Sequence, residues 1–272
     1  MKPPAARRRS TILTVARFDG RKRLRTTAVA SAVLSAYGIL FVWVGPDLVG
    51  GEELQLLIDA MPPLMVELFG FQSLASLSGL LAGEYYTFGW LVGLAGYVAY
   101  TAAGSIAGDM ETGRLDTLLA APISREGVLL GRFLALLVPI VGINAITAPV
   151  LYLATVAVGE PLSFADLLAL HALSVPYLLF WGAVGLLLGV VVGRSRTAGR
   201  VALALVFASW LAESLLDVSD YAWVGAVTPT RYLDTSAVLV DGQYDLAGAI
   251  LLLAATVLLV ALSSRAFARR DL

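Results

Sequence analysis

Six apolar segments, each long enough to cross a bilayer, divide the sequence. A helix needs about 20 mostly apolar residues to cross the hydrocarbon core of a membrane. Only 14 % of the chain is charged, whereas about a quarter of a soluble domain is charged. The sequence therefore predicts an all-α, polytopic membrane protein with one domain over residues 26–272. Its predicted transmembrane helices are 26–45, 86–107, 133–158, 168–193, 201–217 and 246–264.

The basic residues are distributed unevenly along the chain, and this sets the predicted orientation. An even number of spans places both termini on one side of the membrane. With the termini in the cytoplasm, 18 of the 19 Lys and Arg residues lie on the cytoplasmic side, and only Arg231 lies outside. Cytoplasmic loops of membrane proteins carry such an excess of basic residues. We therefore expect a multi-pass protein of the plasma membrane with both termini in the cytoplasm.

Residues 1–25 precede the first span and hold nine of the basic residues. Arg17, Asp19 and the basic run 21–25 interrupt the apolar stretch that a signal peptide would need. We expect a cytoplasmic basic tail and then, over residues 10–25, an amphipathic helix lying on the anionic inner leaflet. A disordered basic tail is the alternative. The apolar residues of this helix are Ile12, Leu13, Val15, Ala16 and Phe18.

Small residues recur one helical turn apart on three of the predicted spans. Such residues let helix backbones approach closely, so the pattern predicts a tightly packed bundle. The positions are Gly104 and Gly108 on span two, Gly185, Gly189 and Gly193 on span four, and Ala204, Ala208 and Ala212 on span five. Kinks are expected at three prolines of spans three and four: Pro139, Pro149 and Pro176.

Residue types needed for several kinds of chemistry are missing from the sequence. There is no cysteine and His171 is the only histidine, which excludes a zinc site built from these ligands. Lys2 and Lys22 are the only lysines, so the Gly-Lys pair of a phosphate-binding loop does not occur. We expect a chain that is not an enzyme, with no metal, no cofactor and no nucleic-acid partner. A membrane-embedded enzyme and a scaffold protein are the alternative classes.

Four polar residues stand out within or beside the predicted spans. His171, near the outer end of span four, fits an ordinary interfacial residue. Glu84 and Glu213 are expected to reach interfacial water rather than to relay protons. Asn144 lies in the middle of span three, where it would hydrogen-bond across helices or line a pathway. Asn144 and Glu213 are the two candidate pathway-lining residues.

The segment 109–132, DMETGRLDTLLAAPISREGVLLGR, is a polar block between spans two and three. Pro122 would end a first short helix. Ser124 suits the N-cap of a second helix, with Glu126 in its first turn. The residues alone fit equally well an interfacial helix or an element that transmits force from a cytoplasmic partner. The apolar side of the first helix has the spacing i, i+3 and i+4: Leu115, Leu118 and Leu119.

The same segment resembles a motif of the permease subunits of ABC-2 type transporters. These chains typically read Glu-x-Gly, then a Leu-Leu pair, Pro-(Ile/Val)-(Ser/Thr)-Arg and a further basic residue. Arg114 and Asp116 replace commoner residues without disturbing the pattern. The basic N-terminal region, the six spans and the string TPTRYLDTSAVLVDG (228–242) extend the resemblance over most of the chain. The matching residues are Glu111, Thr112, Gly113, Leu115, Leu118, Leu119, Pro122, Ile123, Ser124, Arg125, Gly131 and Arg132.

The resemblance implies the membrane subunit of an ATP-driven transporter, with ATP and Mg²⁺ bound by a separate ATP-binding subunit. Two six-span chains, identical or different, would associate in the bilayer. The element between spans two and three would be a cytoplasmic coupling helix docked on the ATP-binding subunit. Most family members export, so we expect export of a hydrophobic or amphipathic compound or a small drug-like molecule. The implied docking residues are Glu111, Gly113, Leu118, Leu119, Pro122, Ser124 and Arg125.

A permease that serves metalloprotein maturation or osmotic stress is the alternative within this architecture. On the outer side, related permeases form short re-entrant helices before the last span, and residues 218–245 fit such helices. Arg231 and Asp234 are expected to pair there at i, i+3. The earlier outer loop, about 46–85, is too rich in acidic residues and proline to cross the membrane. One or two surface helices are expected in it.

Overall fold

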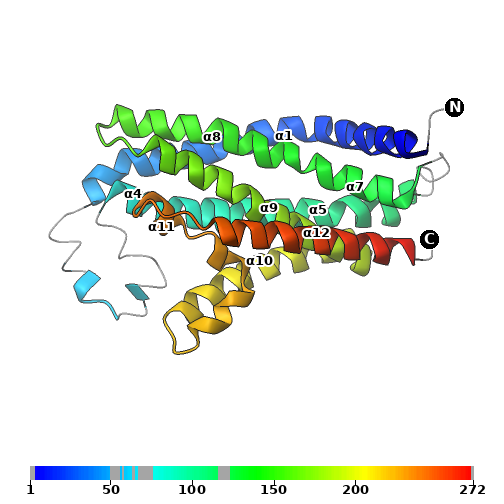
Figure 1. The fold of residues 1–272 in the computed structure, drawn as a ribbon. Coiled ribbons are helices and arrows are strands. Elements are labelled where there is room, and N and C mark those ends of the chain that lie inside the picture. The colour runs from blue at the N-terminus through cyan, green and yellow to red at the C-terminus, as the bar shows by residue number, and fades with distance from the viewer. Residues whose placement is uncertain are drawn as a thin grey trace.

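The computed structural model describes residues 4–49, 56, 58–62, 65–66, 76–115 and 123–270, with side chains in the first helix described from residue 12. The described residues form helices and turns, with no strand among them. Six stretches of helix are long and apolar enough to cross a membrane. They lie side by side, and the first begins at the end of the bundle where the last finishes (Figure 1). The predicted all-α fold with six spans is confirmed.

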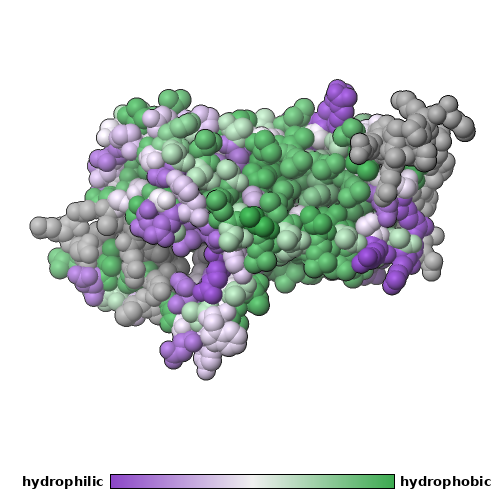
Figure 2. All heavy atoms as spheres, viewed as in Figure 1, coloured by the Kyte–Doolittle hydropathy of each residue, from purple (hydrophilic) through white to green (hydrophobic). Residues whose placement is uncertain are grey.

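The spans follow one another along the chain. Span one is α1 (Pro4–Leu48), and span two joins α4 (Leu77–Leu80), η2 (Leu81–Leu94) and α5 (Ala95–Glu111). Span three joins α7 (Arg125–Ala135) and α8 (Leu137–Ala157). Spans four and five are α9 (Phe164–Val192) and α10 (Ser195–Asp217). After η3 (Ala222–Val227), η4 (Pro229–Tyr232) and α11 (Thr235–Leu239), span six is α12 (Leu246–Ala268). Hydrophobic residues cover the middle of the bundle and hydrophilic residues gather toward its ends (Figure 2).

The first span and the basic region before it form one helix of 45 residues, α1. The structure differs here from the expected boundary near residue 25, because α1 continues alongside α7 and α8. A Cβ at Gly131 would lie 2.6 Å from the Val15 Cβ, so Val15 packs closely against α7. A rise of 1.5 Å per residue gives α1 a length of about 68 Å, and the hydrocarbon core is roughly 30 Å thick. The basic part of α1 therefore prolongs the bundle beyond the apolar belt.

Span two begins at Leu77 rather than at residue 86. Its part after α4, η2, is a π-helix of 14 residues. Such geometry is rare, usually a single turn, and frequent at functional sites. Glu84 lies half-buried inside η2, within the span rather than at its start. The apolar pattern gave a late start because Gly83 and Glu84 interrupt the hydrophobic run.

The closest helix packing joins α5 and α9. A Cβ at Gly185 would lie 2.1 Å from the Ala99 carbonyl oxygen, and one at Gly189 would lie 2.4 Å from the Ala103 carbonyl oxygen. These two glycines therefore bring the backbones together as predicted. The other small-residue pairs behave differently. A Cβ at Gly104 or Gly108 would lie 3.3 or 3.7 Å from the Ser195 hydroxyl oxygen, so these glycines approach a side chain rather than a backbone. Ala204 and Ala208 are exposed on α10.

The three prolines in spans three and four have unequal effects. The helix of span three is interrupted at Leu136, three residues before Pro139, where proline removes one backbone donor from the hydrogen-bond ladder. Pro149 and Pro176 lie inside α8 and α9, which continue past them. Only Pro139 accompanies a break. Span four instead ends at Gly193, whose φ of +69° is the left-handed conformation that glycine adopts readily at a helix C-terminus.

Candidate coupling site

The polar block between spans two and three begins where α5 ends and finishes where α7 begins. Glu111 is the last residue of α5, and Gly113 follows with a φ of +64°. Ser124 caps α7, since its hydroxyl accepts a hydrogen bond from the Gly127 amide at 3.1 Å. Glu126 lies in the first turn of α7. The predicted N-cap and first turn are confirmed.

Arg125 connects this block to the last span. Its guanidinium donates hydrogen bonds to the Arg270 carbonyl at 2.7 Å and to the Phe267 carbonyl at 3.4 Å. These carbonyls lie at the C-terminal end of α12, where the helix leaves acceptors unsatisfied and favours a cation. The side chain is half-buried. Arg125 therefore anchors the start of span three to the end of span six.

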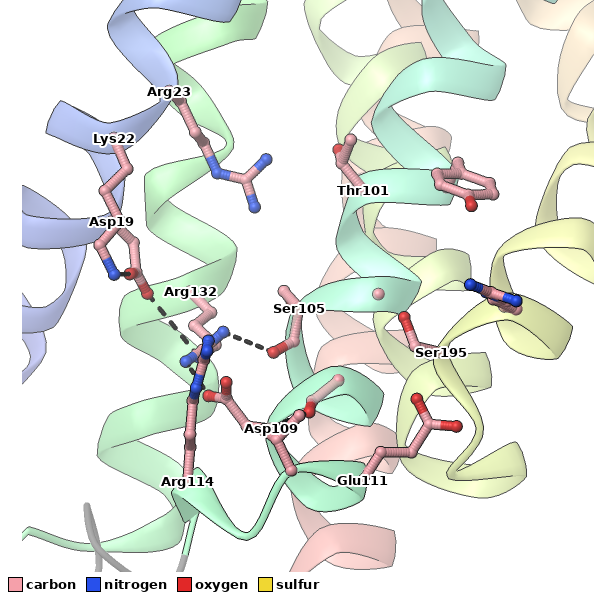
Figure 3. A pocket seen from close by; sticks show the side chains of 15 residues that line it. Asp19, Lys22, Arg23, Thr101, Ser105, Asp109, Glu111, Arg114, Arg132 and Ser195 are labelled. Carbon is pink, nitrogen blue, oxygen red and sulfur yellow. Dashed lines mark hydrogen bonds and ion pairs between the residues drawn. The ribbon is translucent and has the colours of Figure 1, made fainter.

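Arg132 forms a second connection about two turns further along α7 (Figure 3). It pairs with Asp109 of α5, donates to the Ser105 carbonyl, and lies 3.7 Å from a carboxylate oxygen of Asp19 of α1. The side chains of Arg132, Asp109 and Asp19 are only 12–15 % exposed. This cluster joins spans one, two and three. The pairing is not predictable from sequence, because the three residues are far apart in the chain and each alone resembles an ordinary polar residue at a span end.

A cavity of about 610 Å³ opens beside this cluster, between α1, α5 and the start of α10. Figure 3 shows Arg23 and Lys22 of α1 on one side of it and Ser195 on the other. Gly104 and Gly108 leave its floor without side chains. Glu111 and Arg114 of the polar block also line it. The cavity thus adjoins the predicted docking surface.

A comparison with known protein families assigns the chain to one of them. The ABC-2 family transporter protein family matches residues 66–272, which include the polar block and spans two to six. The chain belongs to the ABC-2 transporter family. No curated protein matches the chain. As an ABC-2 permease it is a multi-pass membrane component of a transporter, in agreement with the resemblance found in its sequence.

The docking residues predicted for this ABC-2 permease are only partly described. Leu118, Leu119 and Pro122 lie outside the described residues. Glu111, Gly113 and Ser124 are exposed at the end of the bundle. Leu115 is buried at 1 % exposure in a cluster with Ile106, Val128 and Leu129. The described parts of the polar block thus combine an exposed polar surface with one buried leucine, Leu115, that packs into the bundle.

The opposite end of the permease carries a second charged cluster. The Arg231 Nε lies 3.0 Å from a carboxylate oxygen of Glu213, and its Nη2 lies 3.6 Å from one of Asp217. The Thr228 hydroxyl also donates to Glu213. The expected Arg231–Asp234 pair is not formed, because Asp234 instead caps α11 by accepting from the amides of residues 236 and 237. Glu213 lines a cavity of about 250 Å³ there.

A buried polar network lies between spans two, three and four of the permease. The side-chain oxygen of Asn144 accepts from Trp90 at 3.2 Å and Ser174 at 3.0 Å, and His171 Nδ1 lies 2.6 Å from it. Because that oxygen is an acceptor, His171 carries its proton on Nδ1. The other ring nitrogen, Nε2, then accepts from the Tyr86 hydroxyl at 2.9 Å. His171 is 3 % exposed, so the expectation of an interfacial histidine is wrong.

The network holds Asn144 in the interior, at 6 % exposure. Its amide nitrogen donates to the Ile140 carbonyl at 2.8 Å, so the whole side chain is hydrogen-bonded across and within helices. This matches the first of the two roles expected for Asn144. Pathway lining by Asn144 stays a prediction. Among the described residues, no group of three or more His, Asp or Glu side chains stands close enough to hold a metal ion.

Proposed function

We propose that this permease is the membrane subunit of an ATP-driven exporter in the plasma membrane. A separate ATP-binding subunit would dock on the segment 111–125 at the cytoplasmic end of the bundle. Two permease chains would form the complete membrane part. The substrate would be a hydrophobic or amphipathic compound. Membership of the ABC-2 family supports this proposal.

One observation carries the coupling role: both ends of the docking segment are tied to other spans. At the C-terminal end, Arg125 bonds to the end of α12. Just before the N-terminal end, Asp109 of α5 pairs with Arg132 of α7, which also lies near Asp19 of α1. A displacement of the segment is therefore transmitted to spans one, two, three and six together. An interfacial helix that only rests on lipid would need none of these buried polar contacts. The contacts favour a mechanical element.

The test uses the permease expressed in its own host and purified with a tag, followed by identification of the partners that copurify. We expect a protein that carries a phosphate-binding loop, and ATP hydrolysis by the complex. Glu111→Arg reverses an exposed charge on the docking surface and is expected to lower both partner recovery and ATP hydrolysis at least about tenfold, which is about 1.4 kcal/mol of docking free energy.

The matched control is Glu160→Arg, which reverses an exposed charge after α8, at the other end of the bundle. It is expected to retain the partner and its ATP hydrolysis. Recovery of no ATP-binding protein with the unmodified permease would contradict the proposal. Equal losses from Glu111→Arg and Glu160→Arg would contradict docking on segment 111–125.

A further inference from the structure

Helix α1 packs along α7 and α8 and contacts span two mainly through η2. The remaining seam between α1 and span two is open and holds two cavities. One is the charged cavity of about 610 Å³, and the other is an apolar groove of about 780 Å³. The two cavities adjoin along both helices. Arg23 of α1 and Tyr100 of α5 line the charged cavity. Arg25 of α1 and Tyr97 of α5 line the apolar groove.

The charged cavity has an excess of cations. Five basic and three acidic side chains line it. Arg132 is neutralised by Asp109 and Asp19, and Asp19 also lies 3.7 Å from Lys22. Within the described part of the chain, the guanidinium of the half-buried Arg23 makes no hydrogen bond or ion pair, and it points into the cavity (Figure 3). A guanidinium matches the geometry of phosphate and carboxylate oxygens, so this space favours an anionic group.

The groove has the opposite character and continues from the cavity toward the middle of the bundle. Val29 and Val33 of α1 form one wall at 57 % and 61 % exposure. Gly89 and Gly93 leave the facing wall on η2 without side chains. From Arg25 to Tyr37, the first and last residues of α1 that line the groove, the helix rises about 18 Å. This exceeds half the roughly 30 Å hydrocarbon core, so the groove is long enough for a chain that crosses one leaflet.

We propose that the seam between α1 and span two binds an anionic amphiphile, with its phosphate-type head in the Arg23 cavity and an acyl chain in the Val29–Val33 groove. The charged cavity lies nearer the end of the bundle that holds the termini, and the apolar groove lies nearer the middle. A lipid in the leaflet on that side has its head group and its acyl chain in the same order. The exposed groove wall opens laterally, so the ligand enters from the bilayer. The site is a property of the permease chain and does not depend on the proposed ATP coupling.

The test measures lipid binding to the purified full-length permease by native mass spectrometry. Dioleoyl phosphatidylglycerol, dioleoyl phosphatidylcholine and free glycerol phosphate are titrated separately. The anionic lipid is expected to bind at least about tenfold more tightly than the zwitterionic one. Arg23→Gln is expected to abolish that preference, and Arg196→Gln, at an exposed cavity position, to reduce it. Arg21→Gln removes an exposed charge of α1 outside the cavity and is expected to preserve it.

The groove is tested by filling it with a larger side chain. Val33→Trp is expected to weaken binding of both lipids, whereas Ile39→Trp, exposed on α1 outside the groove, leaves binding unchanged. Circular dichroism and gel filtration verify that each variant is folded. Equal affinity for the two lipids, or equal effects of Arg23→Gln and Arg21→Gln, would overturn the proposal. The proposal would also be overturned if glycerol phosphate bound as tightly as the anionic lipid. It would be overturned as well if Val33→Trp dissociated a permease dimer but left lipid binding unchanged.

Discussion

The guanidinium of Arg132 on α7 and the carboxylate of Asp109 on α5 form an ion pair at the end of the bundle that bears the coupling segment. Their side chains are 13 % and 12 % exposed, and Asp19 of α1 completes the cluster. Asp109 lies two residues before Glu111, and Arg132 lies about two turns beyond the start of α7. The pair therefore fixes the separation between the two ends of the segment.

Arg132→Gln is expected to destabilise the permease strongly. It leaves the largely buried Asp109 carboxylate without its partner and Asp19 with Lys22 alone, and removing one partner of a buried pair costs about 3–5 kcal/mol. The free energy of unfolding, measured by SDS titration in mixed micelles, checks this value. Arg200→Gln, which removes an exposed cation of α10, is the control and is expected to change stability by less than about 0.5 kcal/mol. Similar losses in both variants would contradict a special role for Arg132.

Gly185→Ala is expected to disturb the α5–α9 contact, because the added methyl group would overlap the Ala99 carbonyl oxygen. Overpacking of this kind costs about 1–3 kcal/mol. Gly108→Ala is a matched control, since its nearest neighbour, the Ser195 hydroxyl, would lie at an ordinary 3.7 Å. The same SDS titration compares the two variants. Unchanged stability of Gly185→Ala would contradict the close backbone approach.

Asn144→Leu is expected to destabilise the interior of the bundle. It leaves the donors of Trp90, Ser174 and His171 without their shared acceptor, and an unsatisfied buried donor costs about 1–3 kcal/mol. Ser35→Ala provides the contrast, because the buried Ser35 hydroxyl has no hydrogen-bond partner among the described residues. Its removal is expected to be neutral or slightly stabilising. Equal effects of the two substitutions on unfolding would rule out a cohesive network around Asn144.

Sequence patterns predict those elements that are determined by residues close together in the chain. The last span, predicted over 246–264, is observed as Leu246–Ala268, because an uninterrupted apolar run specifies a membrane helix by itself. The Ser124 cap was predictable for the same reason, since it involves a donor only three residues away. The Gly185 and Gly189 contacts followed from residue size and helical spacing.

Long-range pairings were not predictable in this way. Arg231 had a plausible partner three residues away in Asp234, yet it binds Glu213 on the preceding span, because Asp234 satisfies helix amides instead. For His171, hydropathy predicts the position along the span but not whether the side chain points into the bundle or away from it. Its partner Tyr86 lies 85 residues earlier. The continuous α1 depends likewise on Val15 packing into a space left by Gly131.

Glu213→Gln is expected to weaken the end of the bundle opposite residues 109–132 more than Asp217→Asn does, although both carboxylates face Arg231. Glu213 is 12 % exposed and accepts from Thr228 as well as pairing with Arg231, whereas Asp217 is 62 % exposed. A hydrogen bond to a charged group contributes about 1.5–3 kcal/mol, and an exposed ion pair about 0–1 kcal/mol. The loss of unfolding free energy should therefore differ by about 1–2 kcal/mol between the two variants. Equal losses would mean that the burial of Glu213 does not strengthen its contact with Arg231.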